Sequence, residues 1–295
     1  MRLSKYAAID IGSNAVRLLV SNVIERKNKP TLFTKNAMVR VPIRLGQDTF
    51  THGSIGMPNQ QRLINAMHSF KLLMEVHGVS HYMACATSAL REAKNGAQLI
   101  DRIRKETEVA VELIDGKREA KIIAMTDLYD VMKSHKSYLF IDVGGGSTEL
   151  TVIQRGKTLA SKSFKIGTVR LLNNMVKETE LEDYKNWIEK HTNAIDSISV
   201  VGSGGTINKV FKLTGKKVGK PLSYMLLSEQ YQFLKKQTNK ELLVDMQLNP
   251  DRADVIVPAI HIYLLAMKYS DANKIYVPKV GLADGMVKLL YKELH

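Results

Sequence analysis

The chain has 295 residues, of which 44% are hydrophobic and 24% are charged. This composition is typical of a globular protein with one large or two ordinary domains, and it excludes a disordered chain. The formal net charge of +14 at pH 7 favours polyanionic partners, such as long phosphate chains or nucleic acid, and disfavours cationic ones.

The first part of the chain alternates strand and helix signals. Two strands, at 6–11 and 16–23, flank the polar turn Gly12-Ser13-Asn14, as in a β-hairpin. A helix is predicted from Pro58 to about Gly78, because apolar residues recur there at helical spacing. The other elements predicted in this part are strands at 32–41, 82–86 and 109–114 and helices at 97–107 and 118–132. The mixture indicates an α/β domain.

The same order begins again after residue 136. Strands at 137–141, 149–153 and 158–164 repeat the opening pattern, and Ile9-Asp10-Ile11-Gly12-Ser13-Asn14 is echoed by Ile141-Asp142-Val143-Gly144-Gly145-Gly146-Ser147. Such self-similarity predicts two similarly folded halves. We place the boundary near residue 124, which gives domains of 1–124 and 125–295. The second half is completed by helices at 169–176 and 181–195, a strand at 198–201, and helices that start near residues 207, 229, 252 and 282.

Residues 142–149 carry the strongest chemical signal. The amides of Gly144, Gly145, Gly146 and Ser147 could converge on a phosphate as a backbone nest, although a merely tight hairpin is the alternative. Oxygen ligands of the kind that Mg²⁺ prefers are offered by Asp142, Glu149 and Asp10. The two hairpins together suggest a cleft that grips phosphate, with a divalent cation between its halves.

A third anion site is predicted at Gly204, Gly205 and Thr206, which follow a strand and open a helix. Five lysines come soon afterwards, and they form either a path for a polyphosphate chain or simply a solvated face: Lys209, Lys212, Lys216, Lys217 and Lys220. The histidines show no zinc-ligand spacing, and neither the P-loop nor the Rossmann glycine pattern is present.

Six motifs, in order, resemble the exopolyphosphatase/guanosine pentaphosphate phosphatase (Ppx/GppA) family of the actin and sugar kinase superfamily, in its short two-domain form. The resemblance spans nearly the whole chain and rests on residues 10–14 with Arg17, 86–91 with Asn95, 116–120, 142–149, 167–171 and 202–206. It implies an α/β fold of two ribonuclease H-like (actin-like ATPase) domains that face a central cleft.

The resemblance also implies roles for individual residues. Glu119 is expected to be the general base and Arg91 to clamp phosphate oxygens. Asp142 and Glu149, with Asp10, are expected to hold Mg²⁺. The residues expected to bind phosphate are Gly12, Ser13, Asn14, Gly144, Gly145, Gly146, Ser147, Gly204, Gly205 and Thr206. Three positions depart from the family pattern, namely Arg118, Lys121 and Ala283.

The implied activity is Mg²⁺-dependent release of terminal phosphate from inorganic polyphosphate, which the basic charge favours over guanosine pentaphosphate (pppGpp). The alternatives are a pppGpp 5′-phosphatase, a sensor that binds polyphosphate or (p)ppGpp without hydrolysis, and an actin-like ATPase or sugar kinase. No residue in the sequence indicates the adenosine site that an actin-like ATPase or sugar kinase would need, or the acceptor site that a kinase would also need.

A cytoplasmic location is expected. The polar residues Asp10 and Arg17 interrupt any signal peptide, and the apolar stretch 255–267 is too short for a membrane span. The single Cys85 excludes an internal disulfide and fits a reducing compartment. No membrane or specific nucleic-acid partner is expected, and a homodimer is compatible with the resemblance.

Overall fold

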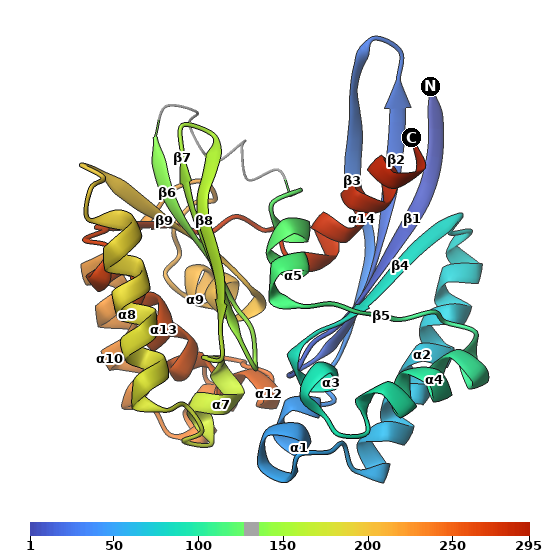
Figure 1. Cartoon of the computed structure of the whole chain (residues 1–295), viewed down its shortest axis with the longest axis horizontal. Helices are drawn as coiled ribbons and strands as arrows, with labels where there is room; N and C mark the ends of the chain where they lie inside the picture. Colours follow the sequence, from blue (N-terminus) through green and yellow to red (C-terminus); the bar gives the residue numbers. More distant parts are fainter. Residues whose placement is uncertain (127–135) are drawn as a thin grey trace. The chain divides into compact units, whose positions relative to one another are not determined.

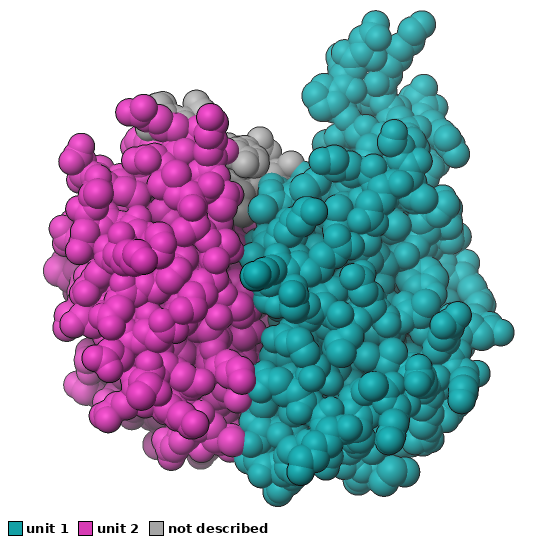
Figure 2. All heavy atoms as spheres, in the orientation of Figure 1, with its two compact units in different colours: residues 1–126, 282–295 teal, residues 127–281 magenta. Residues whose placement is uncertain are grey.

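The computed structural model describes the chain except for residues 127–135. It contains two compact units, coloured separately in Figure 2: unit 1 comprises residues 1–126 and 282–295, and unit 2 comprises residues 127–281. The α/β class predicted from the sequence is confirmed, because each unit is a mixed sheet covered by helices (Figure 1).

Unit 1 is built on a five-stranded sheet with the order β3-β2-β1-β4-β5. The central strand β1 is antiparallel to β2 and parallel to β4. The strands are β1 (Arg2–Ile11), β2 (Val16–Arg26), β3 (Lys29–Val41), β4 (His81–Ala86) and β5 (Glu112–Leu113). The helices are α1 (Leu45–His52), α2 (Met57–His77), α3 (Ser88–Glu92), α4 (Gly96–Thr107), α5 (Gly116–Ile123) and α14 (Leu282–Leu294).

Helices cover both faces of this sheet (Figure 1). On one face, α2 buries the predicted apolar stripe of Leu63, Met67, Phe70 and Met74 against the alternate side chains of β1 and β2. On the other face lies α14, whose Tyr291 ring packs against the rings of Tyr6 on β1 and Phe33 on β3. Because both faces are covered, β1 is buried along most of its length.

The last helix differs from the sequence prediction, which placed residues 282–295 in the second domain. In the structure α14 packs on α5, β1 and β4 and so belongs to unit 1. The approach is close at Gly285, where a Cβ atom would lie 2.1 Å from the carbonyl oxygen of Ile122 on α5. No glycine- or proline-rich linker marks this return of the chain, so the sequence offered no signal for it.

Unit 2 is built on a six-stranded sheet with the order β10-β11-β9-β6-β7-β8. Its strands are β6 (Ser137–Val143), β7 (Thr148–Gln154), β8 (Lys157–Phe164), β9 (Ile198–Ser203), β10 (Leu222–Ser223) and β11 (Lys274–Tyr276). Its helices are α7 (Thr168–Leu172), α8 (Glu178–Thr192), α9 (Gly205–Leu213), α10 (Tyr224–Lys235), α11 (Asn239–Val244), α12 (Pro250–Ala253) and α13 (Ile256–Tyr269).

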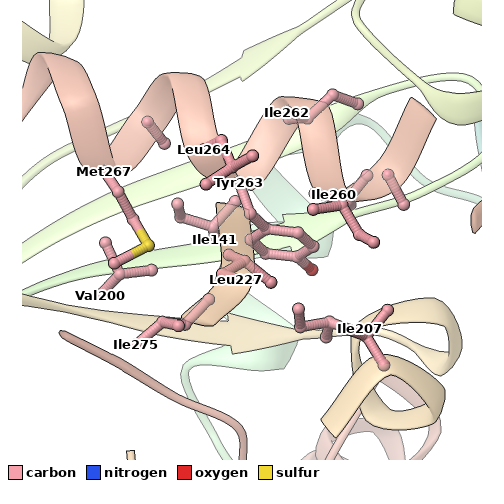
Figure 3. Close-up of a cluster of buried hydrophobic side chains, with 14 of the residues drawn as sticks. Ile141, Val200, Ile207, Leu227, Ile260, Ile262, Tyr263, Leu264, Met267 and Ile275 are labelled. Atoms are coloured by element: carbon pink, nitrogen blue, oxygen red, sulfur yellow. The ribbon is translucent and has the colours of Figure 1, made fainter. Parts of the chain in front are cut away.

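The core of unit 2 is centred on α13, which contains most of the apolar stretch 255–267. Its Tyr263 and Met267 pack among Ile141 of β6, Val200 of β9 and Ile275 of β11 (Figure 3). Among the described residues, no helix combines the length and the apolar character that crossing a lipid bilayer requires.

The first three strands of each half match the prediction closely, whereas shorter elements do not. The strand predicted at 109–114 is reduced to Glu112–Leu113. The helix predicted at 118–132 is α5, which ends at Ile123, and the later part of that prediction falls on residues outside the described chain. The sequence did not indicate α1, α3, α11, β10 or β11.

The close contact at Gly285 gives a test of how α14 is held. Gly285→Ala should lower the free energy of unfolding by roughly 1–3 kcal/mol, because the added methyl group meets a backbone carbonyl that cannot rotate away. Gly281→Ala is the matched control, since a Cβ atom there meets no atom within 4 Å. Urea unfolding of both variants measures the difference, and equal stability would contradict this packing.

Candidate functional site

In each unit, the predicted site residues lie at one edge of the sheet. Parallel strands bring their carboxyl ends to the same edge, and loops at such an edge commonly bind ligands. In unit 1 this edge carries the end of β1, the end of β4 and, just after β5, the start of α5. In unit 2 it carries the ends of β6 and β9 and the segment after β8.

The turn that follows the first strand has the same form in both units. In unit 1 the Gly12 amide donates to the Ala15 carbonyl at 3.2 Å, and in unit 2 the Gly144 amide donates to the Ser147 carbonyl at 2.9 Å. A Cβ atom at Gly12 or at Gly144 would lie 3.1 Å from the accepting oxygen. The similarity of the two halves therefore extends to the hydrogen bonds of the turn.

Across the unit 1 hairpin, the predicted metal ligand Asp10 faces a cation. Asp10 and Arg17 are cross-strand partners, and an Arg17 Nη1 donates to an Asp10 carboxylate oxygen at 3.0 Å. The Asp10 side chain is only 6% exposed. Burial raises the pKa of Asp10, and the Arg17 guanidinium opposes part of that rise. Arg17 therefore braces Asp10 across the hairpin.

Across the unit 2 hairpin, the equivalent position holds a second acid. Asp142 on β6 faces Glu149 on β7, so two carboxylates stand in cross-strand register. Glu149 is buried, and Ser163 on β8 donates its hydroxyl hydrogen to a Glu149 carboxylate oxygen at 2.9 Å. Asp142 is also the register partner of Ser203 on β9. This donor set of carboxylate and hydroxyl oxygens fits Mg²⁺, which binds oxygen ligands.

The glycine turn of unit 2 is held from outside by residues 167–170. A Cβ atom at Gly167 would lie 2.3 Å from the Gly145 carbonyl oxygen, so only glycine fits there without a shift. The buried Arg170 donates from Nε to the Gly146 carbonyl at 2.7 Å. Both contacts use the carbonyl side of the turn. The Gly144 amide is used within the turn, whereas the amides of Gly145 and Gly146 donate to no other backbone group within the described chain.

The predicted anion site at Gly204, Gly205 and Thr206 forms the start of α9. Gly204 precedes the helix with φ of 120°, and no side chain caps the first turn. The buried Tyr263 hydroxyl donates to the Ser203 carbonyl directly before this loop. Burial and the nearby Asp142 carboxylate raise the pKa of Tyr263 well above its ordinary value, so the phenol stays protonated and remains a donor.

In unit 1 the turn residues Ser13 and Asn14 are joined to neighbouring segments. The Ser13 and Ser88 hydroxyls lie 2.9 Å apart, which links the turn to α3. The Asn14 carbonyl accepts from the Arg44 amide at 3.0 Å. Arg91, also on α3, donates to the Ile114 carbonyl at 2.7 Å. This contact ties α3 to the segment that leads into α5.

Glu119 lies in the first turn of α5, as the sequence predicted. Asp115 caps this helix by accepting from the Arg118 amide at 2.7 Å, and Glu119 is buried. A carboxylate is stabilised near the positive end of a helix dipole. The side chain of Arg118, one of the departures from the family pattern, extends to carboxylates at Glu112 (3.5 Å) and Glu293 (3.4 Å).

Several contacts that shape the site could not be found in the sequence. Tyr263 lies 60 residues beyond Ser203 and stands in no recognisable pattern. Ser163 lies only 14 residues beyond Glu149, but its contact depends on the register between β7 and β8, which the sequence does not fix. Arg170 lies within a motif that carries the family resemblance, but its contact with the glycine turn depends on the loop geometry.

Comparison with known proteins identifies relatives of the whole chain. The model of the Ppx/GppA phosphatase family matches residues 23–294. Exopolyphosphatase 1 of Mycobacterium tuberculosis is 23% identical over 304 residues, which cover 96% of this chain and 87% of that protein. A bifunctional 3-dehydroquinate synthase/phosphatase of Fusobacterium nucleatum is 24% identical over 285 residues, or 85% of this chain, but this chain spans only 41% of its length.

Solved structures agree with this. A crystal structure of an exopolyphosphatase from Cytophaga hutchinsonii superposes with a TM-score of 0.83 at 27% identity, covering 99% of this chain and 98% of that one. The Ppx/GppA family member of Aquifex aeolicus superposes with a TM-score of 0.77 at 25% identity and covers both chains completely.

The Asp10–Arg17 pair makes stability depend on pH in a defined way. Arg17→Met should raise the pKa of Asp10 further and cost roughly 1–3 kcal/mol of stability at pH 7, because a buried carboxylate loses its partner. The folded chain then favours the protonated acid more strongly. The loss should therefore shrink as the pH falls through the folded pKa of Asp10. Urea unfolding over a series of falling pH values measures this, with Asp10→Asn/Arg17→Met as the control, and a loss that stays the same at every pH at which the variants fold would contradict it.

Proposed function

The chain belongs to the Ppx/GppA phosphatase family, and from this premise we propose that it is a hydrolase that releases terminal phosphate from inorganic polyphosphate. The observation that carries the proposal is the pair of acids across the unit 2 hairpin. Asp142 and Glu149 face each other beside an anion-binding type of turn, whereas the equivalent acid of unit 1 faces Arg17. Two adjacent carboxylates next to a phosphate site are favoured when a cation lies between them and the phosphate.

We propose that Asp142 and Glu149 hold Mg²⁺, which would neutralise charge on the phosphate oxygens. Asp10 was predicted to join them, but its carboxylate is bonded to Arg17. We therefore assign Asp10 the role of anchoring the unit 1 turn through that ion pair, with direct metal binding as the alternative. The turn residues of both hairpins and the start of α9 would donate amide hydrogen bonds to phosphate oxygens.

Glu119 is proposed as the general base. Its carboxylate takes a proton from a water molecule while the water oxygen bonds to the terminal phosphorus and the bridging P–O bond breaks. The products are inorganic phosphate and a chain shortened by one phosphate. Arg91 would donate to the phosphate oxygens from the guanidinium N–H groups that are not used on Ile114, since one fork can serve two acceptors.

No covalent nucleophile is needed for this reaction, because phosphoryl transfer depends on positioning and charge neutralisation. Cys85 is unsuited to that role. It is fully buried in β4, and burial raises the pKa of its thiol to about 12, which leaves it protonated.

The alternatives are a pppGpp 5′-phosphatase and a non-hydrolysing sensor. The net charge of +14 supports polyphosphate over the nucleotide, because each added phosphate increases the attraction. The sensor hypothesis drew on two departures from the family pattern, Ala283 and Arg118, and the second places a positive charge next in sequence to Glu119. The Arg118 guanidinium lies against Glu112 and Glu293, so its charge is balanced by acids other than Glu119, which supports an active enzyme.

The role of the base can be tested directly. Glu119→Gln should lower the rate of phosphate release on the order of 10²- to 10⁴-fold, because the amide cannot accept the proton. Binding of polyphosphate should be retained. The measurement is phosphate release with Mg²⁺ from long polyphosphate, tripolyphosphate, pppGpp and ATP in parallel. Inactivity of the unmodified protein on all four substrates would overturn the enzymatic proposal.

The metal assignment predicts a change in Mg²⁺ affinity. Glu149→Gln should raise the Mg²⁺ concentration for half-maximal thermal stabilisation by at least about 10-fold, because one anionic ligand is removed. Glu182→Gln, at an exposed position of α8, is the control and should leave this Mg²⁺ concentration unchanged. Equal Mg²⁺ dependence of both variants would show that Glu149 is not a ligand.

A further inference from the structure

A cationic groove lies in unit 2 beyond the end of α9. The loop that joins α9 to β10 carries Lys216, Lys217 and Lys220, and the first residue of β11 adds Lys274. With Pro221 and Ser223 these lysines line an open groove of about 340 Å³. The sequence could not associate Lys274 with the other three, because β11 follows about fifty residues later and joins β10 only in the folded sheet.

The groove has an unbalanced charge. Its lining contains four ammonium groups and no carboxylate. Among the residues that the structure describes, no acidic side chain forms an ion pair with Lys216, Lys217, Lys220 or Lys274. Four like charges around one groove repel each other, and an anion with several charges removes that repulsion.

Only some of the lysines that are clustered in the sequence between 209 and 220 line the groove. Lys209 donates to the Met246 carbonyl at 3.3 Å, and burial lowers the pKa of its ammonium group. Lys209 and Lys212 lie on α9 and do not line the groove. The structure therefore reduces the five-lysine cluster to three members and adds a fourth from a distant strand.

The groove is distinct from the phosphate site at the start of α9. That helix begins at Gly205 and ends at Leu213, so its two ends are separated by roughly 12 Å at 1.5 Å per residue. In the parallel strands β9 and β11, Ser203 is the last residue of one and Lys274 the first residue of the other. The groove thus lies at the opposite edge of the sheet from the site residues of unit 2.

We propose that this groove is a second anion subsite, which holds an internal segment of a long polyphosphate chain while its end is hydrolysed elsewhere. The identity of the ligand rests on the proposed function. A bare phosphate chain suits the groove better than single-stranded nucleic acid, because the lining of lysine, proline and serine contains no aromatic ring on which a base could stack. The subsite gives the protein a preference for long chains.

The test compares two variants with the same net charge. The groove variant changes Lys216, Lys217, Lys220 and Lys274 to Gln. The control variant changes four exposed lysines elsewhere in unit 2 to Gln, and these are Lys157, Lys190, Lys240 and Lys268. Replacement of the groove lysines by Arg keeps the charge and should retain wild-type behaviour.

In the groove variant, the KM for long polyphosphate should rise at least about 10-fold, while kcat/KM for tripolyphosphate stays within about 2-fold. The slope of log affinity against log salt concentration should become shallower by roughly 0.7 for each phosphate charge that the groove no longer neutralises. The control variant should keep the wild-type KM and slope. An equal effect of both variants, or no change in the groove variant, would overturn the proposal.

Binding of long polyphosphate in EDTA separates this inference from the proposed function. If the protein hydrolyses no substrate, a selective loss of polyphosphate binding in the groove variant still supports the subsite. If single-stranded DNA binds the unmodified protein as tightly as polyphosphate, and the groove variant binds both equally poorly, the assignment to polyphosphate is wrong.

Discussion

The residue opposite the first hairpin aspartate is the main difference between the hairpin turns of the two units. A carboxylate withdrawn from water must be compensated by a cation or by hydrogen bonds. In unit 1 the compensation is internal, because Arg17 bonds to Asp10. In unit 2 the same register position holds Glu149, which faces Asp142 and accepts a hydrogen bond from Ser163. One position across a repeated hairpin thus separates a closed, structural ion pair from a pair of acids suited to bind a metal.

Around each turn, the surrounding segments hold the backbone in place through hydrogen bonds and do not contribute further acidic side chains to these contacts. In both units the turn closes through one amide-to-carbonyl bond, and the segment after the third strand donates amides to the turn carbonyls: Gly46 to Ser13, and Val169 to Gly145. Because the turn carbonyls accept hydrogen bonds from these segments, the amide groups on the opposite side of the turn are left to face a ligand. Under the proposed function, such preorganised amides would need little rearrangement when charge develops on a phosphate.

The sequence was sufficient for features that depend on neighbouring residues. The hairpins, the α2 stripe and the position of Glu119 at the start of a helix all follow from local pattern, and the structure contains them. Features in which segments distant in the sequence come together could not be predicted. The assignment of α14 to unit 1, the pairing of β11 with β9 and the contact of Tyr263 with Ser203 join segments distant in sequence, without a composition that marks them. The candidate site was predicted as a set of residues, whereas its supporting contacts were not.

The discontinuity of unit 1 has a consequence for biosynthesis. The sequence of unit 2 lies wholly between β5 and α14, so a ribosome completes it before it reaches the helix that covers one face of the first sheet. During that interval the β1 side chains that later contact α14 lack their cover, and exposed apolar surface of this kind is prone to aggregation. Unit 2 has all of its strands available earlier and can acquire its core first. Unit 1 is therefore begun first, but it can be completed only after the whole of unit 2 has been synthesised.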